Sequence, residues 1–359
     1  MLRIGVIGAG QIAYNHCGEI QSYPEAEIIA VADISEERRT RLQHMYGAEK
    51  SFSDPLELAR AKGIDAVTVA LPNKLHAGVS IAALEAGKHV LLEKPMAMNL
   101  EEAQAVAEAA ERNDRVLMLG MNQRFSREAQ TVKALVKQGV LGDIYHAKTF
   151  WYRRTGTPKF GTWFCRKEMA GGGALLDIGV HLLDLCLHLM GNFQPASVTG
   201  SVYTKFGNRG LGEGSWGMSD REETLFDVDD FATAFIKMRN GATVSLNVSW
   251  AIHQKEENSH NVQLYGTEAG AGTFPPEIYR SARDGDEYHV VAPKNVPLQY
   301  PHRSRFHNWL DAILGKDQLE VTLEEALTVQ RILDAIYASH ESGHEVWFEE
   351  AAAGKPVNA

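Results

Sequence analysis

A lysine stands directly after a strongly apolar segment of the chain. Residues 89–92 are His-Val-Leu-Leu, a pattern that predicts a buried strand, and Glu93, Lys94 and Pro95 follow. Ligands of open α/β sheets bind beyond the carboxyl ends of the strands, where an ammonium can stabilise negative charge on a reacting oxygen. Pro95 restricts Lys94 to an extended backbone and permits a cis bond, which would fix where the ammonium points. Most lysines after strands are simply solvated, and that alternative stays open.

Four polar residues interrupt an otherwise apolar helix predicted over about 172–190. Asp177, His181, Asp184 and His188 follow the spacing i, i+4, i+7 and i+11, which places them on one stripe at about 100° per residue. A polar stripe on a buried helix must meet partners or a pocket. His181 is a member of this stripe whose side chain ordinarily titrates near neutral pH.

The two ends of this stripe have different interpretations. Asp177 and His181 lie nearest to the glycine run 171–173, which has little side-chain bulk and can border an opening. For Asp184 and His188 we favour a hydrogen-bonded core network. Metal ligation is the weaker alternative, because no further cluster of metal-ligating residues supports it, and no metal is predicted.

The N-terminus carries a glycine pattern typical of dinucleotide binding. An apolar strand over 2–7 leads into Gly8-x-Gly10-x-x-Ala13, and a helix follows. Gly8 permits the tight turn, Gly10 lets the backbone approach phosphate, and Ala13 allows close packing of helix and strand. The helix that starts near Gln11 and Ile12 offers unpaired N–H groups and a positive dipole end to a pyrophosphate.

An acidic residue ends the second predicted strand. Asp33 follows the apolar run 28–32, about 20 residues beyond the glycines, where a carboxylate accepts hydrogen bonds from ribose hydroxyls and repels a 2′-phosphate. This favours NAD over NADP. Arg38 complicates the choice, because an arginine can accommodate a 2′-phosphate. As an alternative, Asp33 or Ser35 caps the next helix.

The elements that must position these groups fall into two regions. Strands near 2–7, 27–32, 65–71, 89–92 and 116–119 alternate with helices near 11–22, 35–46, 54–62, 75–86 and 100–113, which predicts a doubly wound parallel sheet of the Rossmann type. Beyond it, a helix at 126–138 and strands at 143–152, 195–205, 229–238, 242–250 and 259–265 predict an α+β domain with a mostly antiparallel sheet, closed by helices at 303–314 and 322–341. The predicted domains are 1–121 and 122–348, with a flexible tail at 349–359.

Composition excludes several classes of partner. The chain has 359 residues and a net charge of −10, which argues against nucleic acid as a partner. No apolar run approaches the roughly 20 residues of a membrane span, so no membrane partner is predicted. The N-terminus has no secretory pattern, and the three cysteines form no close pair. We therefore expect a cytoplasmic protein.

Four separated motifs resemble one oxidoreductase family. The glycine pattern, Asn73-Lys74-Leu75-His76, the stretch 86–95 and Asp177-Ile178-Gly179-Val180-His181 are similar, in this order, to the family of glucose–fructose oxidoreductase, inositol dehydrogenase and rhizopine-catabolism proteins. The resemblance implies that Lys94, Asp177 and His181 are catalytic, that the cofactor is NAD, and that the sheet of the second domain is open-faced and forms homodimers or homotetramers. It also implies cofactor contacts, which we assign to Leu71, Asn73, His76, Glu93 and Lys94.

The resemblance implies transfer of a hydride from a secondary hydroxyl of a sugar, glycoside or cyclitol to NAD. Its polyol substrates require many hydrogen bonds, and Asp177, His181 and four further residues are the candidates to bind them: Arg124, Tyr152, Trp163 and Arg166. Two alternatives stay open. One is a redox-neutral enzyme that retains NAD and cleaves a glycoside by oxidation, elimination, hydration and reduction. The other is a cofactor-binding sensor without catalysis.

Overall fold

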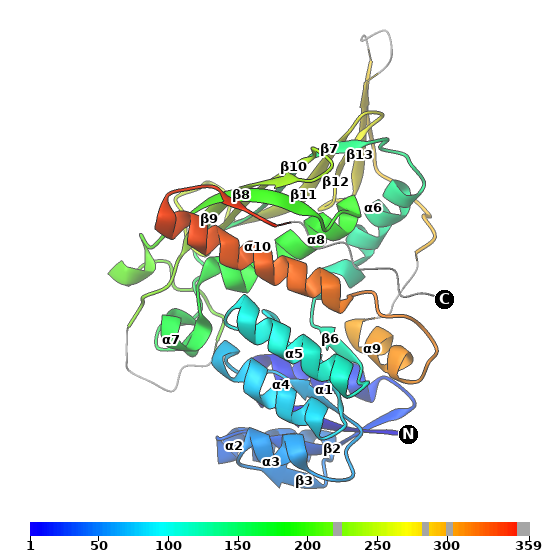
Figure 1. Ribbon diagram of the computed structural model, residues 1–359, viewed down its shortest axis with the longest axis vertical. Coiled ribbons are helices and arrows are strands. Elements are labelled where there is room, and N and C mark those ends of the chain that lie inside the picture. Colours follow the sequence, from blue (N-terminus) through cyan, green and yellow to red (C-terminus); the bar gives the residue numbers. More distant parts are fainter. Residues whose placement is uncertain (218–224, 282–286, 299–303, 350–359) are drawn as a thin grey trace.

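Two β-sheets organise the chain (Figure 1). The computed structural model describes residues 1–217, 225–281, 287–298 and 304–349. One sheet has six strands in the order β3-β2-β1-β4-β5-β6, and the other has nine in the order β14-β13-β12-β11-β7-β10-β9-β8-β15. Most of the predicted flexible tail, residues 350–359, lies outside the described residues. The predicted combination of a Rossmann sheet with a second α+β domain is confirmed.

The first sheet is parallel throughout. Its strands are β1 (Leu2–Ile7), β2 (Ala26–Ala32), β3 (Lys50–Phe52), β4 (Ala66–Val69), β5 (His89–Leu92) and β6 (Leu117–Leu119), and its helices are α1 (Gln11–Gln21), α2 (Glu36–Tyr46), α3 (Pro55–Arg60), α4 (His76–Glu85) and α5 (Leu100–Arg112). All four residues of β4 are buried, as expected for a strand covered on both faces. The strand order reverses between β1 and β4, which is where such sheets bind ligands. Only the three-residue β3 was not predicted.

The second sheet is antiparallel except where β7 pairs with β10. Its strands are β7 (Ile144–Arg153), β8 (Pro195–Tyr203), β9 (Phe231–Met238), β10 (Thr243–Ser249), β11 (Asn258–Gly266), β12 (Gly270–Gly272), β13 (Glu277–Ser281), β14 (Tyr288–Val291) and β15 (Val346–Trp347). Gly241 has a φ of 87° in the turn between β9 and β10, so the Asn-Gly hairpin prediction is confirmed. The short strands β12 to β15 have too little pattern to predict.

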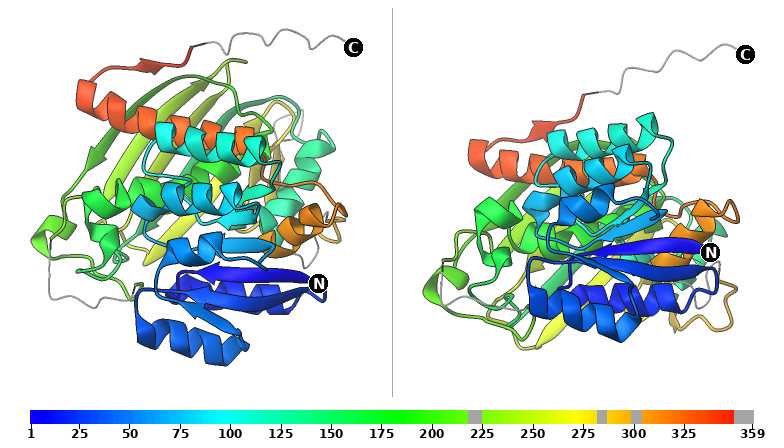
Figure 2. Two further views of the ribbon diagram at one scale, coloured as in Figure 1. Left: turned by 60° about the horizontal axis from the view of Figure 1, so that its bottom comes forward. Right: turned by 90° about the horizontal axis from the view of Figure 1, so that it is seen from below.

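Helices cover only one face of this sheet. Below it in Figure 1 lie α8 (Val180–Met190) and α10 (Leu323–Ser342), with α6 (Arg127–Lys137) at one end, and no helix of the described residues lies on the opposite face. Figure 2 shows the same layers from two further sides. The helical stretch Lys167–Met190, which includes the short α7 (Lys167–Ala170), has the length and hydropathy of a membrane span, contrary to the sequence expectation. However, 83% of its apolar window is buried inside the protein, as in a core helix.

A π-helical turn at Leu175–Gly179 precedes α8. Asp229 accepts hydrogen bonds from the N–H groups of Gly173 (2.7 Å) and Leu175 (2.9 Å) at this turn. A Cβ on Gly173 would lie 1.8 Å from the carbonyl oxygen of Asp229. The glycine run therefore allows close packing against Asp229, and the expectation that its small bulk borders an opening is wrong for Gly173.

One helix from the C-terminal part of the chain packs against the first region. Helix α9 (Arg305–Ile313) packs against α1 and β5, although it belongs to the C-terminal part of the chain. Its first residue, Arg305, donates to the carbonyl of Gly120 at 2.6 Å. The predicted boundary at 121/122 agrees with the separation of the two sheets, but α9 contributes to both regions, so the domain limits stay a prediction.

Candidate active site

Lys94 and Asp177 meet between the two sheets. Lys94 follows β5, the Lys94–Pro95 peptide bond is cis, and Asp177 lies in the π-helical turn before α8. The Lys94 ammonium donates to Oδ1 of Asp177 at 2.7 Å and to the Asp177 carbonyl oxygen at 2.9 Å. An ammonium has three N–H donors, so one donor is left for a ligand. The tertiary fold therefore joins these two residues, 83 positions apart in sequence.

A tryptophan completes the hydrogen bonding of Asp177. Trp250, directly after β10 and fully buried, donates its indole N–H to Oδ2 of Asp177 at 2.9 Å. Burial raises the pKa of Asp177, but the charges of Lys94 and Arg153 and these hydrogen bonds outweigh burial and lower that pKa below its usual value. Asp177 is therefore an ionised carboxylate that holds the ammonium in place. Sequence reasoning missed Trp250, because only the pairing of β10 brings it here.

His181 is the second residue of α8, one helical turn beyond Asp177. Burial and the charge of Lys94 lower the pKa of His181 to about 3, so its imidazole is neutral at physiological pH. Nδ1 of His181 is buried and has no hydrogen-bond partner among the described residues. Nε2 does not share this combination of burial and a missing partner. A neutral imidazole with its hydrogen on Nδ1 presents Nε2 as a proton acceptor. A pKa of about 3 makes it a weaker base than the near-neutral imidazole expected from the sequence.

Glu93 lies behind Lys94 in a buried ionic network. Its Oε1 lies 2.7 Å from the guanidinium of Arg305 and 2.9 Å from Nε2 of His16. Burial raises the pKa of Glu93, but the charge of Arg305 and the hydrogen bond from His16 outweigh it and hold the pKa well below the usual range. In this structure Glu93 therefore anchors α9 and α1 beneath the lysine. Its expected contact with the cofactor ribose stays a prediction.

The glycine turn after β1 fits a dinucleotide pyrophosphate. Gly8 has a φ of 99°, and a Cβ there would lie 2.1 Å from the carbonyl oxygen of Ala70, so only glycine fits. A Cβ on Gly10 would meet no atom within 4 Å, which leaves space beside the backbone. No side chain caps α1, so its first N–H groups, from Gln11 and Ile12 onward, face that space. Gly217 donates its N–H to Oε1 of Gln11 at 3.3 Å.

Asp33 ends β2 beside this turn. Its Oδ2 accepts the N–H of Ala9 at 2.7 Å and its Oδ1 accepts the N–H of Ser35 at 2.8 Å, and each oxygen retains a lone pair for a ribose hydroxyl. Ser35, not Asp33, caps α2 by accepting the N–H of Arg38. The carboxylate therefore braces the glycine turn and is placed at the strand end where the ribose of NAD is expected.

Replacing Asp33 by Ser should reduce the preference for NAD over NADP. Loss of the negative charge removes the repulsion of a 2′-phosphate, so we expect the ratio of kcat/KM for the two cofactors to fall by about tenfold or more. Asp33→Asn serves as the matched control, because it keeps an acceptor oxygen for Ala9 and loses only the charge. Unchanged cofactor ratios in both variants would leave Asp33 with a purely structural role.

The remaining predicted cofactor residues lie at the ends of β4 and β5. Both ring nitrogens of His76 contact backbone oxygens, Nδ1 that of Pro95 at 2.8 Å and Nε2 that of Leu71 at 2.9 Å. His76 thereby ties the two strand ends together. Asn73 donates to the carbonyl oxygen of Ala170 at 2.7 Å and so joins the first region to α7. These contacts position the edge on which a cofactor would lie.

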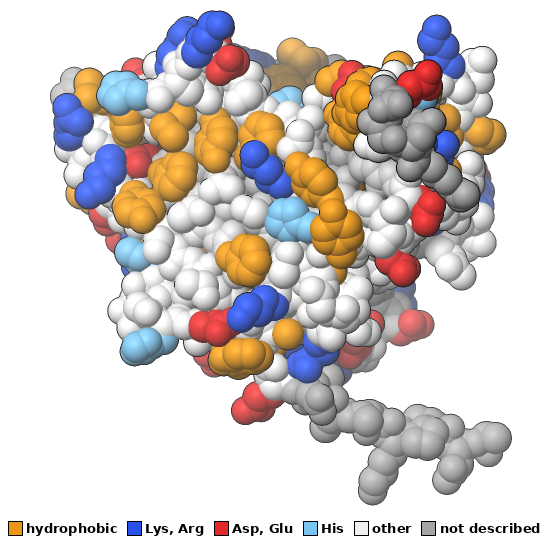
Figure 3. All heavy atoms as spheres, turned by 90° about the horizontal axis from the view of Figure 1, so that it is seen from above, with side chains coloured by type: hydrophobic (Ala, Val, Ile, Leu, Met, Phe, Trp, Pro, Cys, Tyr) orange, Lys and Arg blue, Asp and Glu red, His pale blue; other side chains and the backbone are white. Residues whose placement is uncertain are grey.

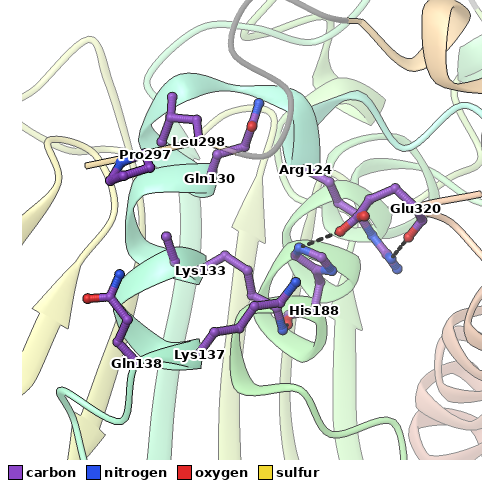
Figure 4. Close-up of a pocket in the computed structure, with 10 residues that line it drawn as sticks. Arg124, Gln130, Lys133, Lys137, Gln138, His188, Pro297, Leu298 and Glu320 are labelled. Atoms are coloured by element: carbon purple, nitrogen blue, oxygen red, sulfur yellow. Dashed lines mark hydrogen bonds and ion pairs between the residues drawn. The ribbon is translucent and has the colours of Figure 1, made fainter. Parts of the chain in front are cut away.

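The structure places Arg124 away from Lys94. Its fully buried side chain donates to both oxygens of Asp184, at 2.5 and 2.8 Å, and to Glu325 at 2.7 Å. It borders a separate pocket of about 390 Å³ at the far end of α8, where His188 lies 3.6 Å from Glu320 (Figure 4). The favoured interpretation as part of a hydrogen-bonded core network is confirmed for Asp184, whereas His188 is buried but lines this pocket. Arg124 belongs to that core network, so the structure contradicts its predicted role in binding substrate.

Tyr152 lies on the face of the second sheet that is turned away from α8. Thr149 of β7 contacts the carbonyl oxygen of Leu182 in α8, and alternation along a strand puts Trp151 and Arg153 on that same face. Tyr152 instead lies on the open face, where its ring stacks on that of Phe231 at 6.4 Å. This position does not support the substrate-binding prediction for Tyr152, and its neighbour Arg153, which sequence reasoning did not consider, lies on the face toward α8.

Trp163 and Arg166 lie beside α7. Trp163 is half-buried and stacks on Phe164 with ring centroids 3.8 Å apart, and Arg166 precedes the first turn of α7. No hydrogen bond or ring contact of the described residues joins either side chain to Lys94, Asp177 or His181. Their role in substrate binding stays a prediction.

Comparisons with known proteins agree with this geometry. A family model described as "Oxidoreductase family, NAD-binding Rossmann fold" matches residues 2–121, and one described as "GFO/IDH/MocA C-terminal domain" matches residues 129–271. The chain is 31% identical over 348 residues to D-glucoside 3-dehydrogenase of Escherichia coli K12, with 96% of this chain and 97% of the relative covered. It is 28% identical over 364 residues to glucose-6-phosphate 3-dehydrogenase of Bacillus subtilis 168, with 100% and 99% covered.

Solved structures are similar over the same length. Levoglucosan dehydrogenase in complex with NADH and levoglucosan has a TM-score of 0.81 at 23% identity, over 96% of this chain and 99% of that chain. An oxidoreductase domain protein from Kribbella flavida has a TM-score of 0.81 at 25% identity, over 97% and 99%.

Proposed function

The chain belongs to the family of glucose–fructose oxidoreductase, inositol dehydrogenase and rhizopine-catabolism proteins, and from this we propose that it is an NAD-dependent dehydrogenase of a sugar, glycoside or cyclitol. The contact of Lys94 with Asp177 beside a neutral His181 is the observation that carries the proposal. The relatives are named as dehydrogenases of glucosides, glucose 6-phosphate and inositols. Because all of these compounds carry ring hydroxyls, a ring hydroxyl is the group that we expect this protein to oxidise.

Lys94, Asp177 and His181 each have one task in the oxidation. NAD, when bound, supplies the acceptor for the hydride that leaves the substrate carbon. Nε2 of His181 accepts the hydroxyl proton, so the alcohol becomes a ketone with the loss of one hydride and one proton. The third N–H of Lys94 binds the substrate oxygen and stabilises the negative charge that develops on it. Asp177 and Trp250 orient that ammonium.

A screen for NADH formation tests this function. The full-length protein is incubated with NAD and with inositols, free aldoses, their glycosides and sugar acids, and absorbance at the NADH band is followed. Turnover with at least one ring alcohol is expected. Glycoside cleavage without accumulation of NADH would replace the proposal with the redox-neutral cycle. NAD binding without turnover of any compound would favour a sensor.

We also propose that the open face of the second sheet joins copies of this chain. Hydrophobic side chains gather on this face in Figure 3. Tyr203, Phe235 and Tyr265 are 41%, 44% and 37% exposed there. Monomeric proteins rarely expose such continuous apolar surfaces. A symmetric dimer or tetramer through this face would bury them.

Replacing Phe235 by Lys should weaken that assembly. A charge at the centre of an apolar interface has no partner and costs its desolvation, so we expect the mass in light scattering to shift toward that of one chain. Met45→Lys is the control, because Met45 is 56% exposed on α2, far from the sheet. If both variants keep the mass of the unmodified protein, the interface lies elsewhere.

A further inference from the structure

Arg153 is the second cation of the substrate side of the site. It ends β7 on the face of the sheet that packs against α8, and its charge lowers the pKa of Asp177. It also lowers the pKa of His260 on β11, after the larger effect of burial. Strand pairing agrees with these effects. Arg153 pairs with Asn258 on β11, two residues before His260. The Tyr152–Ser249 pair puts Arg153 next to Trp250, whose indole donates to Asp177. Neither Asp177 nor His260 accepts a hydrogen bond from Arg153.

The guanidinium of Arg153 is held in place but has few partners. Its Cζ lies 4.6 Å from the centroid of the Trp151 ring, and Trp151 is itself fixed by a 2.8 Å hydrogen bond from its indole N–H to Asn258. Its side chain forms a single hydrogen bond with the described residues, from Nη1 to the carbonyl oxygen of Gly156 at a long 3.4 Å. A guanidinium has five N–H donors, so most of them are unused.

The carboxylates near Arg153 already have other partners, so its positive charge has no ion pair among the described residues. Both oxygens of Asp177 already have partners, Lys94 on Oδ1 and Trp250 on Oδ2. Glu93 is paired with Arg305. Burial lowers the pKa of Arg153. A half-buried cation with free donors close to Asp177 and Lys94 favours a negatively charged ligand.

We propose that the substrate oxidised by Lys94 and His181 carries a carboxylate or a phosphate ester, and that Arg153 binds this anionic group. The inference rests on the proposed dehydrogenase function and adds the charge of the substrate. The planar guanidinium offers parallel N–H donors that match two oxygens of either group. Its stacking on Trp151 fixes the direction of these donors, so the anion also orients the sugar ring.

The first test compares substrates that differ only in charge. NADH formation is measured for methyl glucoside against methyl glucuronide, and for glucose against glucose 6-phosphate. We expect kcat/KM for one anionic member to exceed that of its neutral partner by about tenfold or more, and this preference to fall with added salt. The first pair identifies a carboxylate and the second a phosphate ester.

Arg153→Gln then tests the residue. The variant keeps hydrogen-bonding groups and loses the charge, so kcat/KM for the anionic compound should fall by about 30-fold or more, mainly through KM, while the neutral partner changes by less than about threefold. Arg154→Gln is the matched control. It removes the adjacent arginine, whose exposed side chain donates to the carbonyl oxygen of Lys255. It should leave both values unchanged.

Two outcomes separate this inference from the proposed function. Turnover that favours the neutral members, or an equal loss for both members in Arg153→Gln, overturns the anion site and leaves the dehydrogenase intact. If no compound is turned over, binding of glucuronate and glucose 6-phosphate to the NADH-loaded protein is measured by calorimetry. Binding that Arg153→Gln abolishes then supports the anion site although the proposed reaction has failed, and no saturable binding overturns it.

Discussion

Replacing Lys94 by Ala should lower kcat by on the order of a thousandfold and leave NAD binding nearly unchanged. The variant loses the ammonium that would stabilise the developing alkoxide, and loss of one such donor costs about a hundredfold to a thousandfold. The cofactor cradle at Gly8, Gly10 and Asp33 does not contain the lysine side chain, so we expect the predicted contact of Lys94 with the cofactor to contribute little to NAD affinity. Turnover is followed by NADH absorbance, and NAD affinity by quenching of protein fluorescence.

Removing this ammonium also leaves the Asp177 carboxylate with Trp250 as its remaining side-chain partner. Thermal unfolding must therefore accompany the kinetics, so that a loss of fold is not mistaken for a loss of chemistry. Lys62→Ala is the control, because Lys62 is exposed in the loop after α3. Near-normal kcat in folded Lys94→Ala would remove the lysine from the mechanism.

Arg124→Met should destabilise the fold by about 3–5 kcal/mol, because it leaves the carboxylate of Asp184 buried without its partner. The side chains of Arg124 and Asp184 are both fully buried. The charges of Asp184 and Glu325 raise the pKa of Arg124 against the opposing effect of burial, so the guanidinium stays charged. The free energy of unfolding is measured by urea denaturation, and the folded fraction should keep the KM of the unmodified protein.

The double variant Arg124→Met with Asp184→Leu provides the matched comparison. It replaces the pair by apolar groups and leaves no unpaired charge on α8, so it should recover much of the lost stability. A large rise in KM for Arg124→Met, without loss of stability, would restore the substrate-binding role that the structure does not support.

Local patterns were enough to predict the chemistry of the site but not all of its members. The glycine turn, Asp33 and Lys94 follow predicted strands at the spacing that a parallel sheet requires, so their places at one sheet edge could be derived. Asp177 and His181 follow from helical periodicity. The cis bond before Pro95, foreseen as a possibility, is present in the structure.

The predictions for Tyr152 and Arg124 lack support from the structure for two different reasons. One required the orientation of a strand's two faces, and the other required a partner that is distant in sequence. Tyr152 and Arg153 are neighbours on β7, and a change of one residue in the phase of a strand exchanges its two faces. The residues at the end of β7 are all half-buried, so their burial does not mark the inner face. Arg124 was proposed as a donor to substrate because it follows the predicted domain junction. Its actual partners, Asp184 and Glu325, lie 60 and 201 positions away in sequence, so no local pattern indicates them.

The sequence by itself determined the two kinds of sheet and the dinucleotide turn, because periodicity and spacing act over short stretches of chain. The three residues proposed for catalysis came from the resemblance of separated motifs to a known family. Only the tertiary structure decided what surrounds them: Trp250 on Asp177, Arg305 on Glu93, and Arg153 rather than Tyr152 on the face toward α8. Those contacts depend on strand pairing and on the return of α9 to the first sheet. Such long-range packing has no counterpart in the local pattern of residues.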